Sequence, residues 1–187
     1  MTSILNRITL KNVTEEYLEL ILNWRNQEHV RSMMYHHNPI SLEDHIRWFT
    51  SIQSDERRFV KLFFIDNIPY GVVNLTNINQ HNQTCEWGFY IGPSDAPRGS
   101  GTLMGYSALR CIFEEKEVRK LNAEVLGFNE KSLHFHEKLG FAKEGILRDH
   151  IIRENQLVDV HLYAYFKDTW YIQKGILEKK IKDWFDE

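Results

Sequence analysis

The feature that most constrains this chain is a glycine-containing turn, Pro97–Thr102, between a predicted strand and a predicted helix. Glycines let the backbone approach a ligand closely and turn its N–H groups toward one point. The helix that begins near Gly101 adds unpaired N–H groups and a partial positive charge, which favour a pyrophosphate, and Arg98 can supply a full charge. The turn lacks the Lys-Ser/Thr ending of a Walker loop and the spacing of a dinucleotide fingerprint. Taken alone, it fits an anion site and a plain structural turn equally well.

A second segment, Asn129–Phe141, follows the next predicted strand and indicates another helix start. Asn129 is a favourable N-cap residue. Ser132 and His136 stand at positions i and i+4, so they share one face of that helix. The segment therefore adds a second strand-to-helix junction to the first.

The N-terminal part of the chain predicts two helices. Thr14 is expected to cap the first, which ends near Asn26. The second begins at Ser41, with Asp44 completing a variant capping box, and runs to about Ser54.

The order of all the elements indicates an α+β sandwich in which helices cover a mixed sheet. The other predicted elements are Arg7–Val13, Phe59–Ile65, Tyr70–Asn79, Cys85–Ile91 with a bulge at Gly88, Gly101–Glu115, Lys120–Leu126, Glu130–Leu139, Ala142–Ile152 and Leu157–Phe166. Turns are expected at Asp66-Asn67 and around Glu154-Asn155-Gln156. We therefore expect one domain over residues 1–167. A helical extension over 168–187 is expected to pack on that domain or on a partner subunit of a homodimer.

Composition limits the class of protein. The 187 residues suffice for one domain with a full core, and a net charge of −3 gives no overall attraction to nucleic acid or anionic lipid. The two cysteines and nine histidines show no metal-ligand or disulfide-framework spacing, so we expect no metal. The N-terminus lacks the apolar core of a signal peptide, and no apolar run approaches the roughly 20 residues that span a bilayer. We therefore expect a cytoplasmic protein without membrane or nucleic-acid partners.

The two motifs together resemble the GCN5-related N-acetyltransferase (GNAT) superfamily, over about residues 7–167. The resemblance implies a GNAT-like mixed, mostly antiparallel sheet flanked by helices, and acetyl-CoA as the co-substrate. In that family the first motif cradles the pyrophosphate, and the second lines the pantetheine and thioester end. The cofactor-binding residues implied by the resemblance are Phe89, Ile91, Arg98, Gly99, Ser100, Gly101, Thr102, Asn129, Lys131, Ser132, Phe135 and Lys138.

This sequence departs from the family pattern at two positions. Leu103 stands where the pattern usually has Gly or Ala, so the cradle would be slightly less open. His136 stands where many members carry a tyrosine, which changes the pH behaviour of any proton transfer at that position.

Acetyl transfer from a thioester to an amine requires a neutral amine, donors for the developing oxyanion and a proton for the leaving thiolate. The resemblance implies that the strand near residues 86–91 splays from the strand 120–126, so that backbone near Phe89 and Ile91 binds pantetheine and polarises the thioester carbonyl. We take Glu124 as the base, with Glu86 as its competitor, either of which can act through a water. His136 is the candidate acid, and the alternative is that it only packs or hydrogen-bonds on its helix.

Two polar residues on apolar helix faces are candidates for binding the acceptor. Arg25 is in register with Leu18 and Ile21, and His45 lies beside Phe49. A buried arginine is costly unless it is paired. Arg25 therefore either forms a salt bridge with a carboxylate of the chain or binds an anionic acceptor through its guanidinium fork.

The string Trp24-Arg25-Asn26, with Met34, Tyr35 and His45, resembles the nucleotide-sugar N-acetyltransferases of pseudaminic-acid biosynthesis. These enzymes acetylate the 4-amino group of a UDP-linked 4-amino-4,6-dideoxy-N-acetylaltrosamine. The resemblance implies that Arg25 and His45 contact the diphosphate or its nucleotide, while Met34 and Tyr35 frame the sugar or uracil.

Other acceptors stay open. The Trp-Arg-Asn helix also occurs in RimJ/RimL-like enzymes that acetylate ribosomal-protein N-termini. The segment 144–149 is shared with those enzymes and with polyamine acetyltransferases. A non-catalytic acyl-CoA-binding domain is the alternative from a different class.

Overall fold

A computed structural model describes residues 3–116 and 118–185 of the chain. Within these residues, seven strands form one sheet in the order β1-β2-β3-β4-β5-β7-β6. The strands are β1 (Ile8–Asn12), β2 (Phe59–Ile65), β3 (Ile68–Asn79), β4 (Thr84–Ile91), β5 (Lys120–Leu126), β6 (Ala142–Arg153) and β7 (Gln156–Phe166). The α-helices are α1 (Leu18–Asn26), α2 (Glu28–Arg31), α3 (Leu42–Ser54), α4 (Ser100–Arg110), α5 (Glu130–Leu139) and α6 (Lys167–Phe185). The mixed, mostly antiparallel sheet with flanking helices confirms the predicted fold class.

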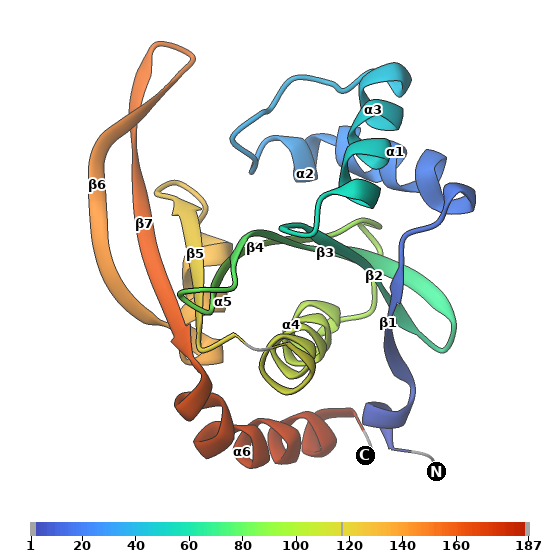
Figure 1. Cartoon of the computed structure of the whole chain (residues 1–187), viewed down its shortest axis with the longest axis vertical. Helices are drawn as coiled ribbons and strands as arrows, with labels where there is room; N and C mark the ends of the chain where they lie inside the picture. Colours follow the sequence, from blue (N-terminus) through green and yellow to red (C-terminus); the bar gives the residue numbers. More distant parts are fainter. Residues whose placement is uncertain (1–2, 117, 186–187) are drawn as a thin grey trace.

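The helices cover both faces of the sheet, with α1, α2 and α3 on one face and α4 and α6 on the other (Figure 1). Strand β2 shows how the sequence produces two cores. Leu62 lies in one core cluster with Ile21 of α1, whereas its neighbour Phe63 lies in the other, with Leu103 of α4 and Leu139 of α5. Successive side chains of a strand point to opposite faces, so an unbroken apolar run such as β2 supplies both cores.

The two predicted hairpin turns form as expected. Asp66 and Asn67 have φ values of 50° and 65°, and Glu154 and Asn155 have φ values of 50° and 62°. Asn and Asp tolerate this left-handed region better than most residues, and two such residues in succession match the twist of a hairpin. Local turn chemistry therefore sets the register of β2 with β3 and of β6 with β7.

Among the described strands, the one parallel pairing, between β4 and β5, is short. It runs only from Thr84↔Lys120 to Glu86↔Asn122, although β4 continues to Ile91 and β5 to Leu126. Beyond Glu86 the two strands separate, which confirms the predicted splay. This separation positions the candidate site.

Two local predictions were wrong. Thr14 does not cap a helix, because a 3-10 turn (η2, Glu15–Tyr17) separates it from α1, and its hydroxyl donates to Glu16 Oε1 at 2.9 Å. Gly88 does not form a bulge, because β3 and β4 pair in unbroken register from Gly71↔Ile91 to Thr76↔Glu86.

Other boundaries agree closely. Ser41 caps α3 by accepting from the Asp44 N–H at 3.1 Å, and α3 ends at Ser54. The helix expected over Gly101–Glu115 begins one residue earlier and ends in a π-helical turn, Cys111–Glu115. The short helix α2 was not predicted.

The C-terminal helix α6 packs on the core of the chain. Trp170 and Ile181 are buried within the same core as α4 and the sheet. Trp170 Nε1 donates to Glu114 at 2.9 Å, and Tyr106 of α4 donates to Glu178 at 2.6 Å. None of the helices in the described ranges is long and apolar enough to cross a bilayer.

Candidate active site

The separation of β4 from β5 opens a cavity of about 340 Å³. The Gly92 N–H donates to Tyr70 of β3 at 2.9 Å, and backbone groups alternate in direction along an antiparallel strand. The N–H and C=O groups of Phe89 and Ile91 therefore point away from β3, toward the side that β5 has left. This arrangement supplies backbone donors and acceptors that suit a ligand with amide groups, such as pantetheine.

The turn before α4 presents backbone groups that suit an anion. Gly99 has a φ of 90°, and the ring of Phe185 lies 2.3 Å from where its Cβ would stand. A side chain at position 99 would thus be strained and would displace that ring. Within residues 3–116 and 118–185, the Gly101 and Thr102 N–H groups have no backbone partner. Together with the positive end of α4 they fit a pyrophosphate.

Helix α5 packs against the start of α4. Asn129 Oδ1 accepts from the Ser132 N–H at 3.2 Å, which confirms the predicted N-cap. The ring of Phe135 lies 3.8 Å from where a Cβ of Gly101 would stand, so α5 approaches α4 closely at its glycines.

The predicted cofactor residues fall into two groups. Four of them line the cavity between the strands: Phe89, Ile91, Asn129 and Ser132. The others lie at the start of α4 and along α5: Arg98, Gly99, Ser100, Gly101, Thr102, Lys131, Phe135 and Lys138. Arg98 is exposed and joins no ion pair in the part of the chain that the structure describes.

His136 lies at the floor of the cavity and is 2% exposed. Its Nδ1 lies 2.7 Å from the Ser132 carbonyl oxygen, to which it donates, and its Nε2 accepts from the Trp87 indole N–H at 3.2 Å. Burial among aromatic rings lowers the pKa of His136 to about 4. The imidazole is therefore neutral at physiological pH, and both of its nitrogens are engaged.

Two strand carboxylates lie near the mouth of the cavity. Glu124 of β5 accepts from the Tyr35 hydroxyl at 2.6 Å, and Glu86 of β4 accepts from Asn77 at 2.9 Å. Burial, the hydrogen bond to Glu124 and the charges of both carboxylates raise the pKa of Tyr35. Tyr35 therefore stays protonated and orients Glu124.

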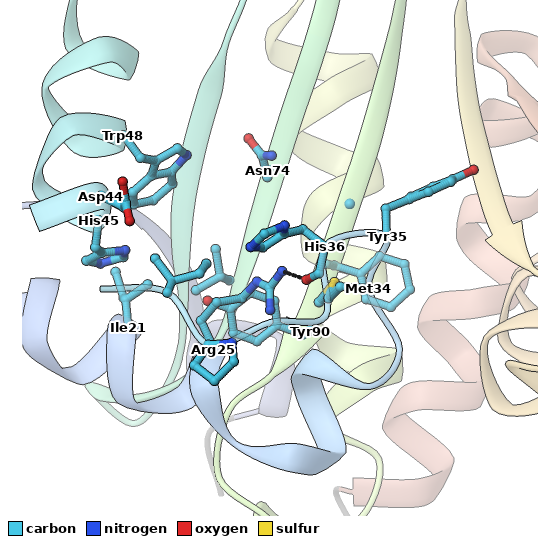
Figure 2. A pocket seen from close by; sticks show the side chains of 15 residues that line it. Ile21, Arg25, Met34, Tyr35, His36, Asp44, His45, Trp48, Asn74 and Tyr90 are labelled. Atoms are coloured by element: carbon cyan, nitrogen blue, oxygen red, sulfur yellow. Dashed lines mark hydrogen bonds between the residues drawn. The ribbon is translucent and has the colours of Figure 1, made fainter. Parts of the chain in front are cut away.

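A second cavity, of about 680 Å³, adjoins the first on the face covered by α1 and α3 (Figure 2). It brings together all four predicted acceptor residues, Arg25, Met34, Tyr35 and His45. Both cavities share a common wall: Met34, Tyr35, Asn74, Gly88, Phe89 and Tyr90. A ligand in the second cavity can therefore reach one bound between β4 and β5.

Two nitrogens in this second cavity lack partners. Arg25 Nη2 donates to the His36 carbonyl at 2.7 Å, but Arg25 Nη1 is buried with no hydrogen-bond partner among the described residues. His45 Nε2 is likewise buried and unpartnered there. Burial lowers the pKa of both side chains. No ion pair in the described ranges includes Arg25, so the salt-bridge alternative is not observed.

The neighbours of Arg25 hold it in place. Trp24 is buried against Gly92, whose Cβ would stand 2.0 Å from the indole. The Asn26 amide makes two hydrogen bonds with the Ile40 backbone, at 2.9 and 2.8 Å, and so secures the loop 32–41. The Trp-Arg-Asn string therefore anchors α1, presents a guanidinium and fixes the roof of the cavity.

Sequence reasoning missed several lining residues: His36, Trp48, Asn74, Gly88 and Tyr90. Asn74 carried a usable signal, since it is a polar residue inside the apolar run of β3. Trp48 gave none, because a tryptophan at helical spacing also fits a core position. Within the described chain, no group of three or more His, Cys, Asp or Glu side chains could hold a metal ion.

The sequence of this chain is similar to those of known proteins. The Acetyltransferase (GNAT) domain family matches residues 7–142. Acetyltransferase PseH of Campylobacter jejuni is 31% identical over 137 residues, which cover 72% of this chain and 84% of PseH. The SPbeta prophage-derived N-acetyltransferase YokL of Bacillus subtilis is 29% identical over 171 residues, covering 90% of this chain and 94% of YokL.

Solved structures show the same fold. Spermidine N-acetyltransferase from Vibrio cholerae, in complex with CoA and spermine, has a TM-score of 0.82 at 21% identity. The match covers 89% of this chain and 99% of the Vibrio chain.

Proposed function

Because the chain belongs to the GNAT acetyltransferase family and is an acetyl-CoA-dependent N-acetyltransferase, we propose that its acceptor is the 4-amino group of a UDP-linked amino-dideoxy sugar. The observation that carries this proposal is the pair of unpartnered buried nitrogens, Arg25 Nη1 and His45 Nε2, in the larger cavity. On this proposal the enzyme acts in pseudaminic-acid biosynthesis.

A diphosphate matches these two groups. A buried guanidinium nitrogen without a partner costs free energy, which an anionic oxygen of a ligand would offset. Phosphate oxygens also suit the fork geometry of arginine. The cavity volume of about 680 Å³ lies in the range of small-molecule sites and leaves room for a nucleotide beside the sugar.

A polyamine fits the same cavity less well. Spermidine acetyltransferases are among the relatives of this chain, with 26% identity for the Vibrio cholerae enzyme. A polyamine is a cation, and the Arg25 guanidinium in the larger cavity would repel it. Asp44, the carboxylate in that cavity wall, is already hydrogen-bonded to Ser41 and Arg47.

On this proposal, residues at the junction of the two cavities each carry out one part of the acetyl transfer. Acetyl-CoA supplies the acetyl group as an activated thioester: the amine nitrogen forms the new C–N bond, the C–S bond breaks, and CoA leaves as a thiolate that takes up a proton from the solvent. Glu124 accepts a proton from the acceptor amine, directly or through a water, and Tyr35 orients its carboxylate. The outward-facing Phe89 N–H donates to the thioester oxygen as negative charge develops on it. Gly88, with no heavy atom within 4 Å of its missing Cβ, leaves the passage between the cavities open.

The test is steady-state kinetics of Arg25→Ala with acetyl-CoA and a UDP-linked 4-amino-4,6-dideoxy sugar. We expect the KM for the sugar nucleotide to rise about 10- to 100-fold, as for loss of a charge-assisted hydrogen bond, while the KM for acetyl-CoA changes little. Arg57→Ala is the matched control, since Arg57 is exposed and pairs only with Asp55 within the described chain.

Two results would contradict the proposal. One is an equal rise in both KM values for Arg25→Ala. The other is a higher kcat/KM of the wild-type enzyme for spermidine or for a ribosomal-protein N-terminal peptide than for the sugar nucleotide.

A further inference from the structure

Helix α6 lies along the lower part of the molecule, below α4 in the view of Figure 1. Near its start, Trp170 stacks against Phe113 with ring centroids 6.5 Å apart, and farther along Glu178 accepts from Tyr106 at 2.6 Å. At its end the ring of Phe185 lies against Gly99. Residue numbers along α6 therefore increase in the direction in which those along α4 decrease, so the two helices run antiparallel. The C-terminal end of α6 lies beside the turn at Gly99.

Trp184, next to Phe185, presents an aromatic surface at this place. Its side chain is 60% exposed, and Lys138 Nζ of α5 lies 4.2 Å from its ring centroid. The ammonium holds one region of the indole through a cation–π contact. More than half of this residue stays exposed, so the indole is accessible to a planar ligand.

The face of α5 that carries Lys138 is basic. Lys131, His134 and Lys138 follow one another at i, i+3 and i+7, so they share one face of α5. None of the three joins an ion pair among the described residues. The face therefore keeps positive charge close to a turn that already fits a pyrophosphate.

We propose that Trp184 and Lys138 form the site for the adenosine 3′-phosphate end of acetyl-CoA. The indole stacks on the adenine ring, and the Lys138 ammonium binds the 3′-phosphate. Adenosine is attached directly to the pyrophosphate, so a pyrophosphate on the Gly101 and Thr102 N–H groups brings adenine to the end of α6. The helix after the catalytic fold is thereby part of the co-substrate site.

The experiment is isothermal titration of the full chain with three ligands: CoA, 3′-dephospho-CoA and 4′-phosphopantetheine. No acceptor is present, so the result is independent of which amine the enzyme acetylates. Trp184→Ala should weaken CoA and 3′-dephospho-CoA equally, by about fivefold or more, as for loss of one base–aromatic stack. It should leave 4′-phosphopantetheine unchanged, because that ligand lacks adenine. Trp184→Phe should retain most of the affinity.

Lys138→Ala separates the phosphate contact from the stack. We expect it to weaken CoA by about tenfold, as for loss of a charge-assisted contact, and to leave 3′-dephospho-CoA within about twofold. Ile172→Ala and Lys180→Ala, exposed positions elsewhere on α6, are the matched controls and should bind all three ligands as wild type does.

Three results would overturn the proposal. If Trp184→Ala bound CoA with wild-type affinity, the proposed stack on adenine would be wrong. An equal loss for 4′-phosphopantetheine would show that Trp184 only supports the Gly99 turn. If Lys138→Ala lost affinity for CoA and 3′-dephospho-CoA equally, the proposed contact with the 3′-phosphate would be wrong.

Discussion

His136 and Glu124 show how single residues acquire their chemistry from neighbours distant in sequence. The Trp87 indole N–H occupies the lone pair of His136 Nε2, and the Ser132 carbonyl accepts the Nδ1 proton. A neutral imidazole in this arrangement has no free N–H to give to a leaving thiolate. The geometry therefore favours the packing role for His136 over the acid role.

The buried His136 predicts acid sensitivity of the fold. Above pH 6.5 the folded and unfolded states both hold a neutral imidazole. As the pH falls from 6.5 toward the folded-state pKa of about 4, the unfolded chain takes up a proton that the folded protein excludes. The free energy of unfolding should fall by about 3 kcal/mol from this group over that window.

Urea unfolding of wild type and His136→Phe at pH 7 and pH 4.5 measures the effect. The variant should lose less stability between the two pH values than wild type does, and its kcat at pH 7.5 should stay within about threefold. A fall in kcat of about 100-fold would instead support His136 as the acid.

The carboxylates of Glu124 and Glu86 have different hydrogen-bond partners, and this difference predicts which of them is the base. Glu124 is held by Tyr35 of the acceptor cavity, whereas Glu86 is held by Asn77, which lies outside both cavities. Glu124→Gln should lower kcat by about 100-fold or more, in line with loss of a general base. Glu86→Gln, the matched variant, should lower it by less than about fivefold. The reverse order in single-turnover kinetics would transfer the role to Glu86.

At the scale of elements, the loop 32–41 connects the site to α1 and α2. Asn26 holds Ile40, Arg25 holds the His36 carbonyl, and Arg31 donates to the His37 carbonyl at 2.9 Å. These side chains place Met34 and Tyr35 at the junction of the cavities. Short polar clamps on the loop backbone thus fix a segment that has no secondary structure over most of its length.

The turn before α4 gives a prediction at the same scale. Gly99→Ala places a Cβ at a φ of 90° and against the Phe185 ring. It should lower the free energy of unfolding by about 1–2 kcal/mol for the left-handed conformation alone, and weaken acetyl-CoA binding. Gly175→Ala on α6 is the control, since its Cβ meets open space and should stabilise the helix by about 0.5–1 kcal/mol.

Urea unfolding and titration with CoA measure both variants. Equal stability of Gly99→Ala and wild type would show that the turn relaxes without cost. Unchanged CoA binding in a destabilised Gly99→Ala would separate the turn from the co-substrate site.

At the scale of the whole molecule, the sheet opens at one place, where two cavities adjoin. The separation of β4 and β5 exposes backbone of β4 to the cavity that adjoins α5 and that Glu86 lines, while Gly88 and Tyr90 also line the cavity under α1 and α3. Two ligands can therefore approach Gly88 from different sides of the same strand. Helix α6 completes the core through Trp170 and extends to the turn at Gly99.

Much of this could be predicted from sequence where the interactions are local. The bounds of β5 and α5, the Asn129 and Ser41 caps and the Asp66-Asn67 turn depend on residues a few positions apart. Capping, hairpin twist and side-chain periodicity act over that range, so short sequence patterns are enough to predict them. The family motifs at 98–102 and 129–141 are local in the same sense.

Only the tertiary structure decided the remaining features. Tyr35 and Glu124 are 89 residues apart, and Trp87 and His136 are 49 apart, so no spacing rule connects them. Gly88 stays in regular register because β3 pairs with it, and the end of α6 reaches Gly99 because Trp170 and Glu178 align two helices. The physical reason is that burial and long-range hydrogen bonds depend on which surfaces meet on folding. The sequence by itself therefore determined the elements and the acetyl-CoA motifs, while the tertiary structure decided the protonation of His136, the orientation of Glu124 and the reach of α6.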